Sequence, residues 1–195
     1  MNKNIRNDSK ILLTEWDKQL MAYHEVGHAV CSYNLPEREE LLCITIDPSN
    51  QAFGMIKTAE RKHHNETEIS STSLIITLLA GRISEEMFLK SKSTSCIYDL
   101  EAAQKIATDM VLKFGMGKKT RLFAVNLEYN YLFSESLKKM ICEDITEIII
   151  NAENEARKIL QQNDNVVKEM VKKILKLGTL NKQEIKAFFK EFSNE

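Results

Sequence analysis

The chain has 195 residues, 43% of them hydrophobic, which is enough to bury the core of one domain with a helical appendage. Its formal net charge of −1 argues against a basic surface, so we expect no nucleic-acid partner. The longest apolar run, residues 74–81, is too short to cross a bilayer, and no apolar signal segment follows the polar residues 1–10. Four scattered cysteines without a C-x-x-C pair fit a reducing compartment, so we expect a cytoplasmic protein.

The first predicted helix covers residues 14–35. Thr14 and Asp17 have the spacing of a capping box at its start, and Pro36 ends it. Gly27 interrupts an otherwise favourable helical sequence, and a glycine inside a helix costs about 1 kcal/mol relative to alanine. Close approach of another backbone segment or of a substrate would explain this glycine, and a glycine tolerated without function is the alternative.

The centre of this helix reads H-E-V-G-H at residues 24–28. Residues four apart lie on one helix face, so His24 and His28 can reach the same metal ion. Glu25 lies beside them, where it could take a proton from a water molecule at the metal. The spacing therefore indicates a hydrolytic zinc site that still needs a third protein ligand. The alternative is a chance motif in which the histidines cap, pack or face solvent.

The rest of the chain predicts a mainly α fold with a small β-sheet. Five further segments have the periodicity of regular elements, namely strands at residues 41–47 and 52–58 and helices at residues 71–89, 99–115 and 134–163. Two shorter helices close the chain, the last capped by Asn181 with Glu184 three residues on. Residues 1–195 are expected to form one domain, with 1–13 as a flexible lead-in and 134–195 as a C-terminal helical part.

Five segments resemble, in order, the peptidase domain of the FtsH family, the membrane-anchored AAA+ zinc proteases grouped as peptidase family M41. They are M-A-Y-H-E-V-G-H-A-V at residues 21–30, Q-A-F-G at 51–54, L-A-G-R-I-S-E-E at 79–86, S-T-S-C-I-Y-D-L at 93–100 and F-G-M at 114–116. The likeness covers nearly the whole chain. It implies an HExxH zinc metallopeptidase fold that binds one Zn²⁺ per chain.

The resemblance also implies roles for individual residues: His24, His28 and Asp99 as the zinc ligands and Glu25 as the general base. Two residues depart from the family pattern near the third ligand. Tyr98 replaces an asparagine, and Ser95 replaces a glycine.

The residues alone leave the third ligand open. Asp99 fits either a metal ligand or an ordinary N-cap, because a helix is predicted to begin there. Cys96 offers a thiolate three residues earlier, and Glu86 offers a carboxylate on the helix that follows Gly81. Glu85 and Glu86 have two other readings, as a solvated face or as a brace that orients the histidines.

The predicted function is a zinc-dependent endopeptidase that hydrolyses peptide bonds in unstructured or extended polypeptides. Such a substrate can pair with an exposed strand through main-chain hydrogen bonds, and we expect Ala52, Phe53, Gly54 and Met55 to bind it. The alternative is a non-catalytic or latent zinc-stabilised interaction module. The presence of Glu25 disfavours this alternative, since a structural site needs no base.

Only 23 residues precede His24, and no G-x-x-x-x-G-K-S/T motif occurs. We therefore expect either an excised domain or a peptidase without its own ATPase or membrane anchor. The resemblance implies a ring of six chains. The limited surface of one peptidase domain favours a monomer or small oligomer instead.

Overall fold

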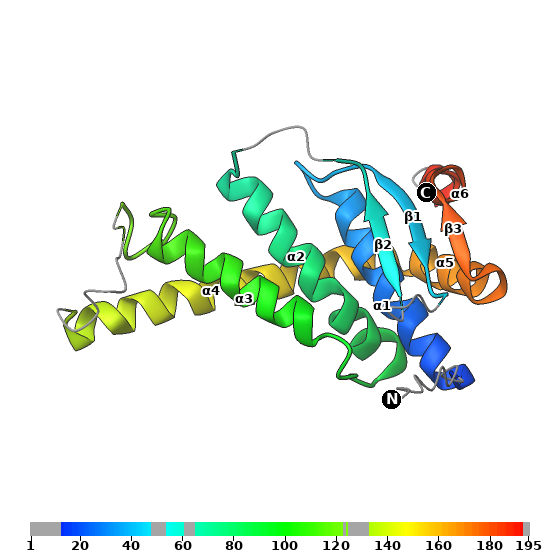
Figure 1. Cartoon of the computed structure of the whole chain (residues 1–195), viewed down its shortest axis with the longest axis horizontal. Coiled ribbons are helices and arrows are strands. Elements are labelled where there is room, and N and C mark those ends of the chain that lie inside the picture. The colour runs from blue at the N-terminus through cyan, green and yellow to red at the C-terminus, as the bar shows by residue number, and fades with distance from the viewer. Residues whose placement is uncertain (1–12, 48–53, 61–64, 123, 125–132, 193–195) are drawn as a thin grey trace, which may run out of the picture.

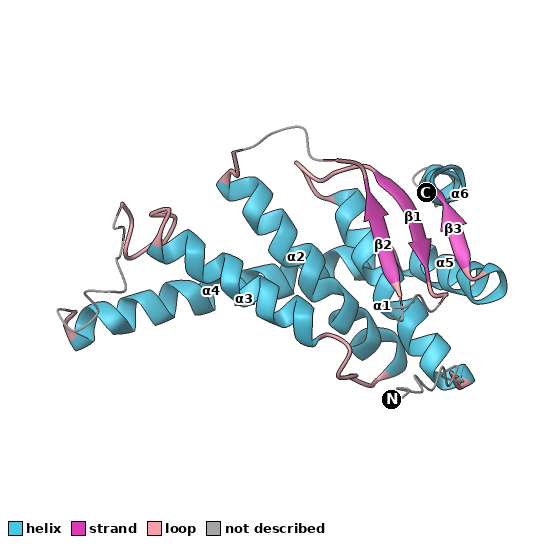
Figure 2. Ribbon diagram, in the orientation of Figure 1, coloured by secondary structure: helices cyan, strands magenta, loops and turns pink. Residues whose placement is uncertain are grey.

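The computed structural model describes residues 13–47, 54–60, 65–122, 124 and 133–192. The described residues form a mainly α fold with one small antiparallel sheet, as the sequence predicts (Figures 1 and 2). In chain order the elements are α1 (Glu15–Asn34), β1 (Leu41–Thr45), β2 (Met55–Thr58), α2 (Glu68–Ser84), the π-helix η1 (Glu85–Leu89), α3 (Ile97–Leu112), α4 (Glu135–Gln162), α5 (Asp164–Leu177), β3 (Thr179–Asn181) and α6 (Lys182–Phe192).

Helix α1 begins with the predicted capping box. The backbone N–H of Asp17 donates to the Thr14 hydroxyl at 3.1 Å, and the backbone N–H of Thr14 donates to the Asp17 carboxylate at 2.9 Å. Gly27 lies against α2, where a Cβ atom would come within 2.7 Å of the Ala80 carbonyl oxygen and 2.6 Å of the Ser84 Cβ. Of the explanations left open for Gly27, the structure has the close approach of another backbone segment, which brings α1 directly against α2.

The sheet has the strand order β2-β1-β3, so β2 is an edge strand. Ile44 in the central strand pairs with Ile56 on one side and with Leu180 on the other. Ile44 and Leu180 are fully buried and join the sheet to the helical core. The sequence did not predict β3. Asn181 ends this strand and caps α6 by accepting from the backbone N–H of Glu184 at 3.1 Å, as predicted.

The predicted bounds of two helices were wrong. Helix α2 begins at Glu68 rather than at the predicted residue 71, because the Thr67 hydroxyl accepts from the backbone N–H of Ser70 and caps the helix. The predicted helix at residues 71–89 also divides, with its last turn widening into η1. Helix α3 spans Ile97–Leu112, so it begins and ends earlier than the predicted residues 99–115.

Helices α3 and α4 run side by side and extend away from the sheet, while α5 and α6 lie on the side of β3 (Figure 1). One continuous core joins α1, α2, α4, α5 and the sheet. Its fully buried members include Val26, Ile75, Leu160 and Ile174. Among the described residues, no helix combines the length and the apolar character that a bilayer crossing requires.

Candidate metal centre

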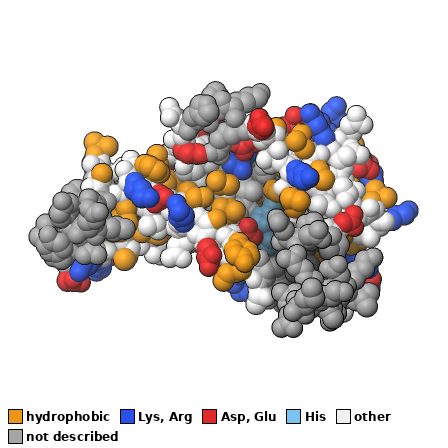
Figure 3. All heavy atoms as spheres, viewed as in Figure 1, with side chains coloured by type: hydrophobic (Ala, Val, Ile, Leu, Met, Phe, Trp, Pro, Cys, Tyr) orange, Lys and Arg blue, Asp and Glu red, His pale blue; other side chains and the backbone are white. Residues whose placement is uncertain are grey.

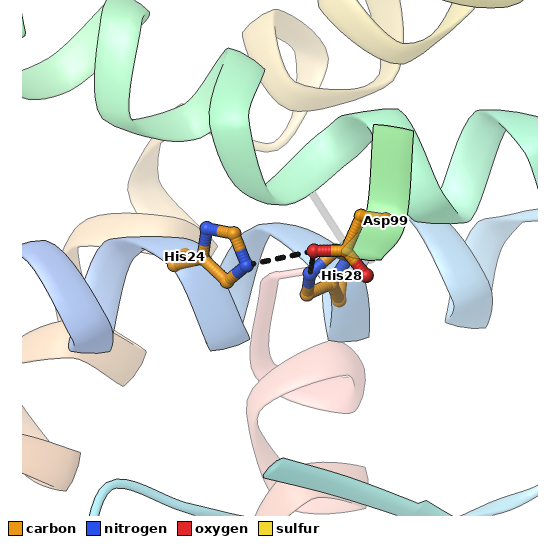
Figure 4. Close-up of side chains that lie close together, drawn as sticks. All are labelled: His24, His28 and Asp99. Carbon is orange, nitrogen blue, oxygen red and sulfur yellow. Dashed lines mark hydrogen bonds and ion pairs between the residues drawn. The ribbon is translucent and has the colours of Figure 1, made fainter. Parts of the chain in front are cut away.

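His24, His28 and Asp99 meet where α1 passes the first turn of α3 (Figure 4). Nε2 of His24 lies 3.1 Å from Oδ2 of Asp99, and Nε2 of His28 lies 3.5 Å from the same oxygen. Their ligand atoms all lie within 4.8 Å of one another. In the described part of the chain, no other three histidine, cysteine, aspartate or glutamate side chains form such a group. The fold thus brings His24 and Asp99, which are 75 positions apart in the sequence, into contact.

Both imidazoles are oriented through their other ring nitrogen. Nδ1 of His28 lies 2.7 Å from the carbonyl oxygen of Thr77, which can only accept, so Nδ1 carries the proton. Nδ1 of His24 lies 2.8 Å from Oε1 of Glu85. A carboxylate or carbonyl partner on Nδ1 holds a histidine ring and leaves Nε2 for a metal.

The arrangement fits a zinc ion. Zinc–nitrogen and zinc–oxygen bonds of about 2.0–2.2 Å in a tetrahedron place neighbouring ligand atoms roughly 3.3 Å apart. The Nε2–Oδ2 distances of 3.1 Å and 3.5 Å lie on either side of that value. Two imidazoles and one carboxylate also form the ligand set that leaves a fourth zinc position open.

Glu85 connects the histidine to the loop that precedes α3. Its side chain is fully buried, and its carboxylate accepts from the backbone N–H of Ser93 at 2.7 Å and from the Ser93 hydroxyl at 2.9 Å. Burial alone would raise the pKa of this carboxyl, but the hydrogen bonds with His24 and Ser93 outweigh it and lower the pKa. Glu85 is therefore an ionised brace, one of the roles the sequence left open for it.

Glu86, the neighbouring glutamate, lies outside the cluster. Its Oε2 lies 3.1 Å from Nη2 of Arg157 on α4 and 3.4 Å from Nζ of Lys92. These cations hold the pKa of Glu86 below its usual range, although its partial burial opposes them. The other rival ligand, Cys96, also lies outside the cluster, and its thiol donates to the carbonyl oxygen of Ser93 at 3.3 Å.

The charges in the centre stabilise one another. Burial alone would lower the pKa of His24, but hydrogen bonds with Asp99 and Glu85 outweigh it and raise the pKa to about 9. Burial opposes the ionisation of Asp99 as well, yet its contacts with His24 and His28 hold its pKa well below the usual range. The pKa of Glu25 moves the other way, because burial raises it. Glu25 is thus the carboxyl in this centre whose affinity for a proton is increased.

Two glycines make room for these side chains. A Cβ atom on Gly81 of α2 would come within 2.5 Å of Nε2 of His28 and 2.8 Å of Nε2 of His24. A Cβ atom on Gly54 would come within 2.6 Å of Oε1 of Glu25. Gly81 had no predicted role, although a glycine inside a predicted apolar helix could have signalled a close approach.

Gly54 is also the point where the candidate base meets the edge strand. Met55 begins β2 directly after it. The other two residues predicted to bind substrate, Ala52 and Phe53, lie outside the described residues.

Two histidines one helical turn apart, with a glutamate after the first and a carboxylate from a second helix, define the class of HExxH metal centres typical of zinc peptidases. Comparison with known proteins agrees with this class. The model of peptidase family M41 matches residues 11–188, and the chain belongs to that family.

Curated relatives carry the name ATP-dependent zinc metalloprotease FtsH. The one from Nitrosococcus oceani is 30% identical over 191 residues, which cover 92% of this chain and 30% of that protein. The one from Caldicellulosiruptor bescii is 32% identical over 186 residues, which cover 89% of this chain and 30% of that protein. The chain thus spans about 30% of the length of these relatives. At the level of the family, they support a metalloprotease.

Proposed function

We propose that this chain is a zinc-dependent endopeptidase acting on unstructured or extended polypeptides. The observation that carries the proposal is the convergence of two oriented Nε2 atoms and the Asp99 carboxylate beside the buried Glu25. The proposal treats the chain as one M41-like domain, because a single core joins α1 and α2 to α5 and the sheet.

His24, His28 and Asp99 would hold the zinc ion. Bound there, zinc would polarise the carbonyl group of the scissile peptide bond and lower the pKa of a water molecule to about 7. Glu85 and the Thr77 carbonyl hold both imidazole rings through Nδ1, which would leave Nε2 of each ring for the metal.

Glu25 would act as the general base. It directly follows His24 on α1, is buried, and has a pKa that burial raises. A carboxylate of raised pKa is better suited to accept the proton of the attacking water and then to donate it to the leaving amine. A site with a purely structural metal has no use for such a group.

The substrate would lie along the edge strand β2. Among the described residues, the sheet order leaves one side of β2 without a neighbouring strand, and Gly54 brings the start of this strand against Glu25. An extended backbone hydrogen-bonded to β2 would pass the base at Gly54 and Met55. This arrangement favours substrates by their extended conformation rather than by a long sequence motif.

The rival function is a zinc-stabilised interaction module that binds other proteins without cleaving them. One experiment separates the two. The purified chain is assayed for bound zinc and for cleavage of casein, with Glu25→Gln as the matched variant. An endopeptidase binds about one zinc per chain and cleaves casein, whereas Glu25→Gln keeps the zinc and loses cleavage by at least a hundredfold. Bound zinc without cleavage by the unaltered chain would favour the interaction module.

The oligomeric state stays a prediction of a monomer or small oligomer. Light scattering at micromolar concentration measures it directly, and a stable hexamer would contradict it.

A further inference from the structure

The metal centre opens to solvent at Asp99. The His24 and His28 side chains are each 8% exposed, whereas that of Asp99 is 24% exposed. Within the cluster, the most exposed side is therefore at the first turn of α3, which carries Asp99.

The residues on either side of Asp99 present apolar surface there. Successive residues of an α-helix are about 100° apart around its axis, so the side chains of Tyr98 and Leu100 leave α3 on either side of the Asp99 side chain. Tyr98 is 79% exposed and Leu100 is 38% exposed. Figure 3 shows hydrophobic side chains directly beside the histidine surface, over the place where α3 begins in Figure 1.

Tyr98 is the more conspicuous of the two. It is the most exposed aromatic residue among the large apolar side chains that the structure describes. A rigid ring beside the ligands offers a large contact area with little loss of conformational entropy on binding.

We propose that Tyr98 determines specificity by contacting a large apolar side chain of the substrate next to the scissile bond. This inference rests on the proposed endopeptidase function. The occupant is a side chain of the substrate rather than a second protein, because Tyr98 directly precedes Asp99 in α3, and Asp99 is the most exposed of the three ligands in the cluster. Phenylalanine and leucine are the side chains that such a surface binds best, and serine and aspartate are those it binds worst.

The test uses pairs of fluorogenic peptides that differ only in phenylalanine or serine at each residue flanking the scissile bond. The unaltered chain should have a higher kcat/KM for the phenylalanine peptide. Tyr98→Asn should lower that preference by about two- to tenfold, mainly by raising KM, and Tyr98→Phe should retain it. Zinc content should be the same in all three.

Leu122→Ala is the matched control. Leu122 is 97% exposed and lies beyond the opposite end of α3, so its removal should leave the preference unchanged. An unchanged preference in Tyr98→Asn would overturn the proposal. A change of oligomeric state in Tyr98→Asn would also overturn it, because the ring would then contact another chain.

A binding experiment keeps this proposal separate from the proposed function. The zinc-loaded Glu25→Gln chain is titrated with the same peptides, and fluorescence anisotropy should show tighter binding of the phenylalanine peptide only while Tyr98 is present. If the unaltered chain cleaves neither peptide, the endopeptidase proposal fails. Equal binding of both peptides, with and without Tyr98, would refute the specificity role itself.

Discussion

Gly54 and Glu25 are so close that a single added carbon atom would overlap the carboxylate. A Cβ atom on Gly54 would lie 2.6 Å from Oε1 and 2.9 Å from Cγ of Glu25. The start of the edge strand therefore contacts the group that we propose as the base. Any side chain at Gly54 must displace Glu25, since atoms at these distances overlap.

The first prediction is that Gly54→Ala impairs catalysis more than folding. The displaced group belongs to a flexible side chain, so we expect a loss of stability of about 1 kcal/mol, at the low end of the cost of overpacking. We expect kcat to fall about tenfold to a hundredfold, because a base displaced by an ångström is poorly placed. Zinc content should not change. Gly27→Ala is the contrasting variant, since its Cβ would meet the Ala80 carbonyl oxygen at 2.7 Å and should lower Tm instead.

The second prediction is that Glu85→Gln weakens zinc binding although Glu85 is not a ligand. The amide keeps the shape of the side chain but removes the charge that faces Nδ1 of His24 at 2.8 Å. Loss of such a partner typically costs about 10- to 100-fold in metal affinity. Competition with a chelator measures this directly. Glu86→Gln should bind zinc as the unaltered chain does, because Glu86 contacts Arg157 instead.

Glu85 and Glu86 show which features could be predicted from the sequence and which could not. The pattern of the chain predicted a mainly α fold and the capping box of α1, and the structure has both. It could not distinguish Glu85 from Glu86. Both residues lie in the first turn of η1, where the helix widens, and there one faces His24 and the other faces Arg157. Such π-helical turns are rare, so the α-helical pattern of the sequence did not predict this one.

The missed strand has a similar cause. Strand β3 spans only Thr179–Asn181, which is too short to display an alternating pattern. It forms because Leu180 pairs with Ile44, more than a hundred residues away in the chain. The early start of α3 was missed for another reason. Cys96 at its N-cap makes no side-chain capping hydrogen bond, so the usual signal of a helix start is absent.

The third prediction concerns the third ligand. Asp99→Ala should lose zinc, whereas Cys96→Ser should keep about one zinc per chain, because the Cys96 thiol is engaged with the Ser93 carbonyl outside the cluster. Metal analysis after gel filtration measures both. The reverse result, with zinc lost only in Cys96→Ser, would transfer the ligand role to the thiolate.

The fourth prediction concerns stability and pH. Asp144 of α4 is buried and accepts from the backbone N–H groups of Thr120, at 2.8 Å, and Lys119, at 2.9 Å. Burial alone would raise the pKa of Asp144, but these hydrogen bonds outweigh it and hold the pKa below its usual range. A depressed carboxyl pKa stabilises the fold above the unfolded value of about 4, and this contribution is lost as the pH falls further.

Asp144→Asn should therefore lower the free energy of unfolding at pH 7 by about 1–3 kcal/mol and flatten its decline below pH 4. Urea unfolding at pH 7 and pH 3 measures both effects. Asp109→Asn is the control, because Asp109 pairs with Lys105 and Lys113 at the surface, where such pairs contribute about 0–1 kcal/mol. Equal losses in the two variants at pH 7 would contradict the role of the buried carboxylate.

The last prediction is that cleavage by this chain is limited by how often a substrate opens. Docking beside Met55–Thr58 requires an extended backbone, which a folded protein offers only when it unfolds locally or globally. The population of the open form falls tenfold for each increase of about 1.4 kcal/mol in the substrate's stability, so the rate should fall in proportion when opening and closing are fast. A series of destabilised variants of one folded protein, compared with casein, measures how steeply the rate falls with substrate stability.

The 195 residues contain no G-x-x-x-x-G-K-S/T motif, so adding ATP to the pure chain should leave every rate unchanged. Cleavage that is insensitive to substrate stability, or that accelerates with ATP, would rule this account out.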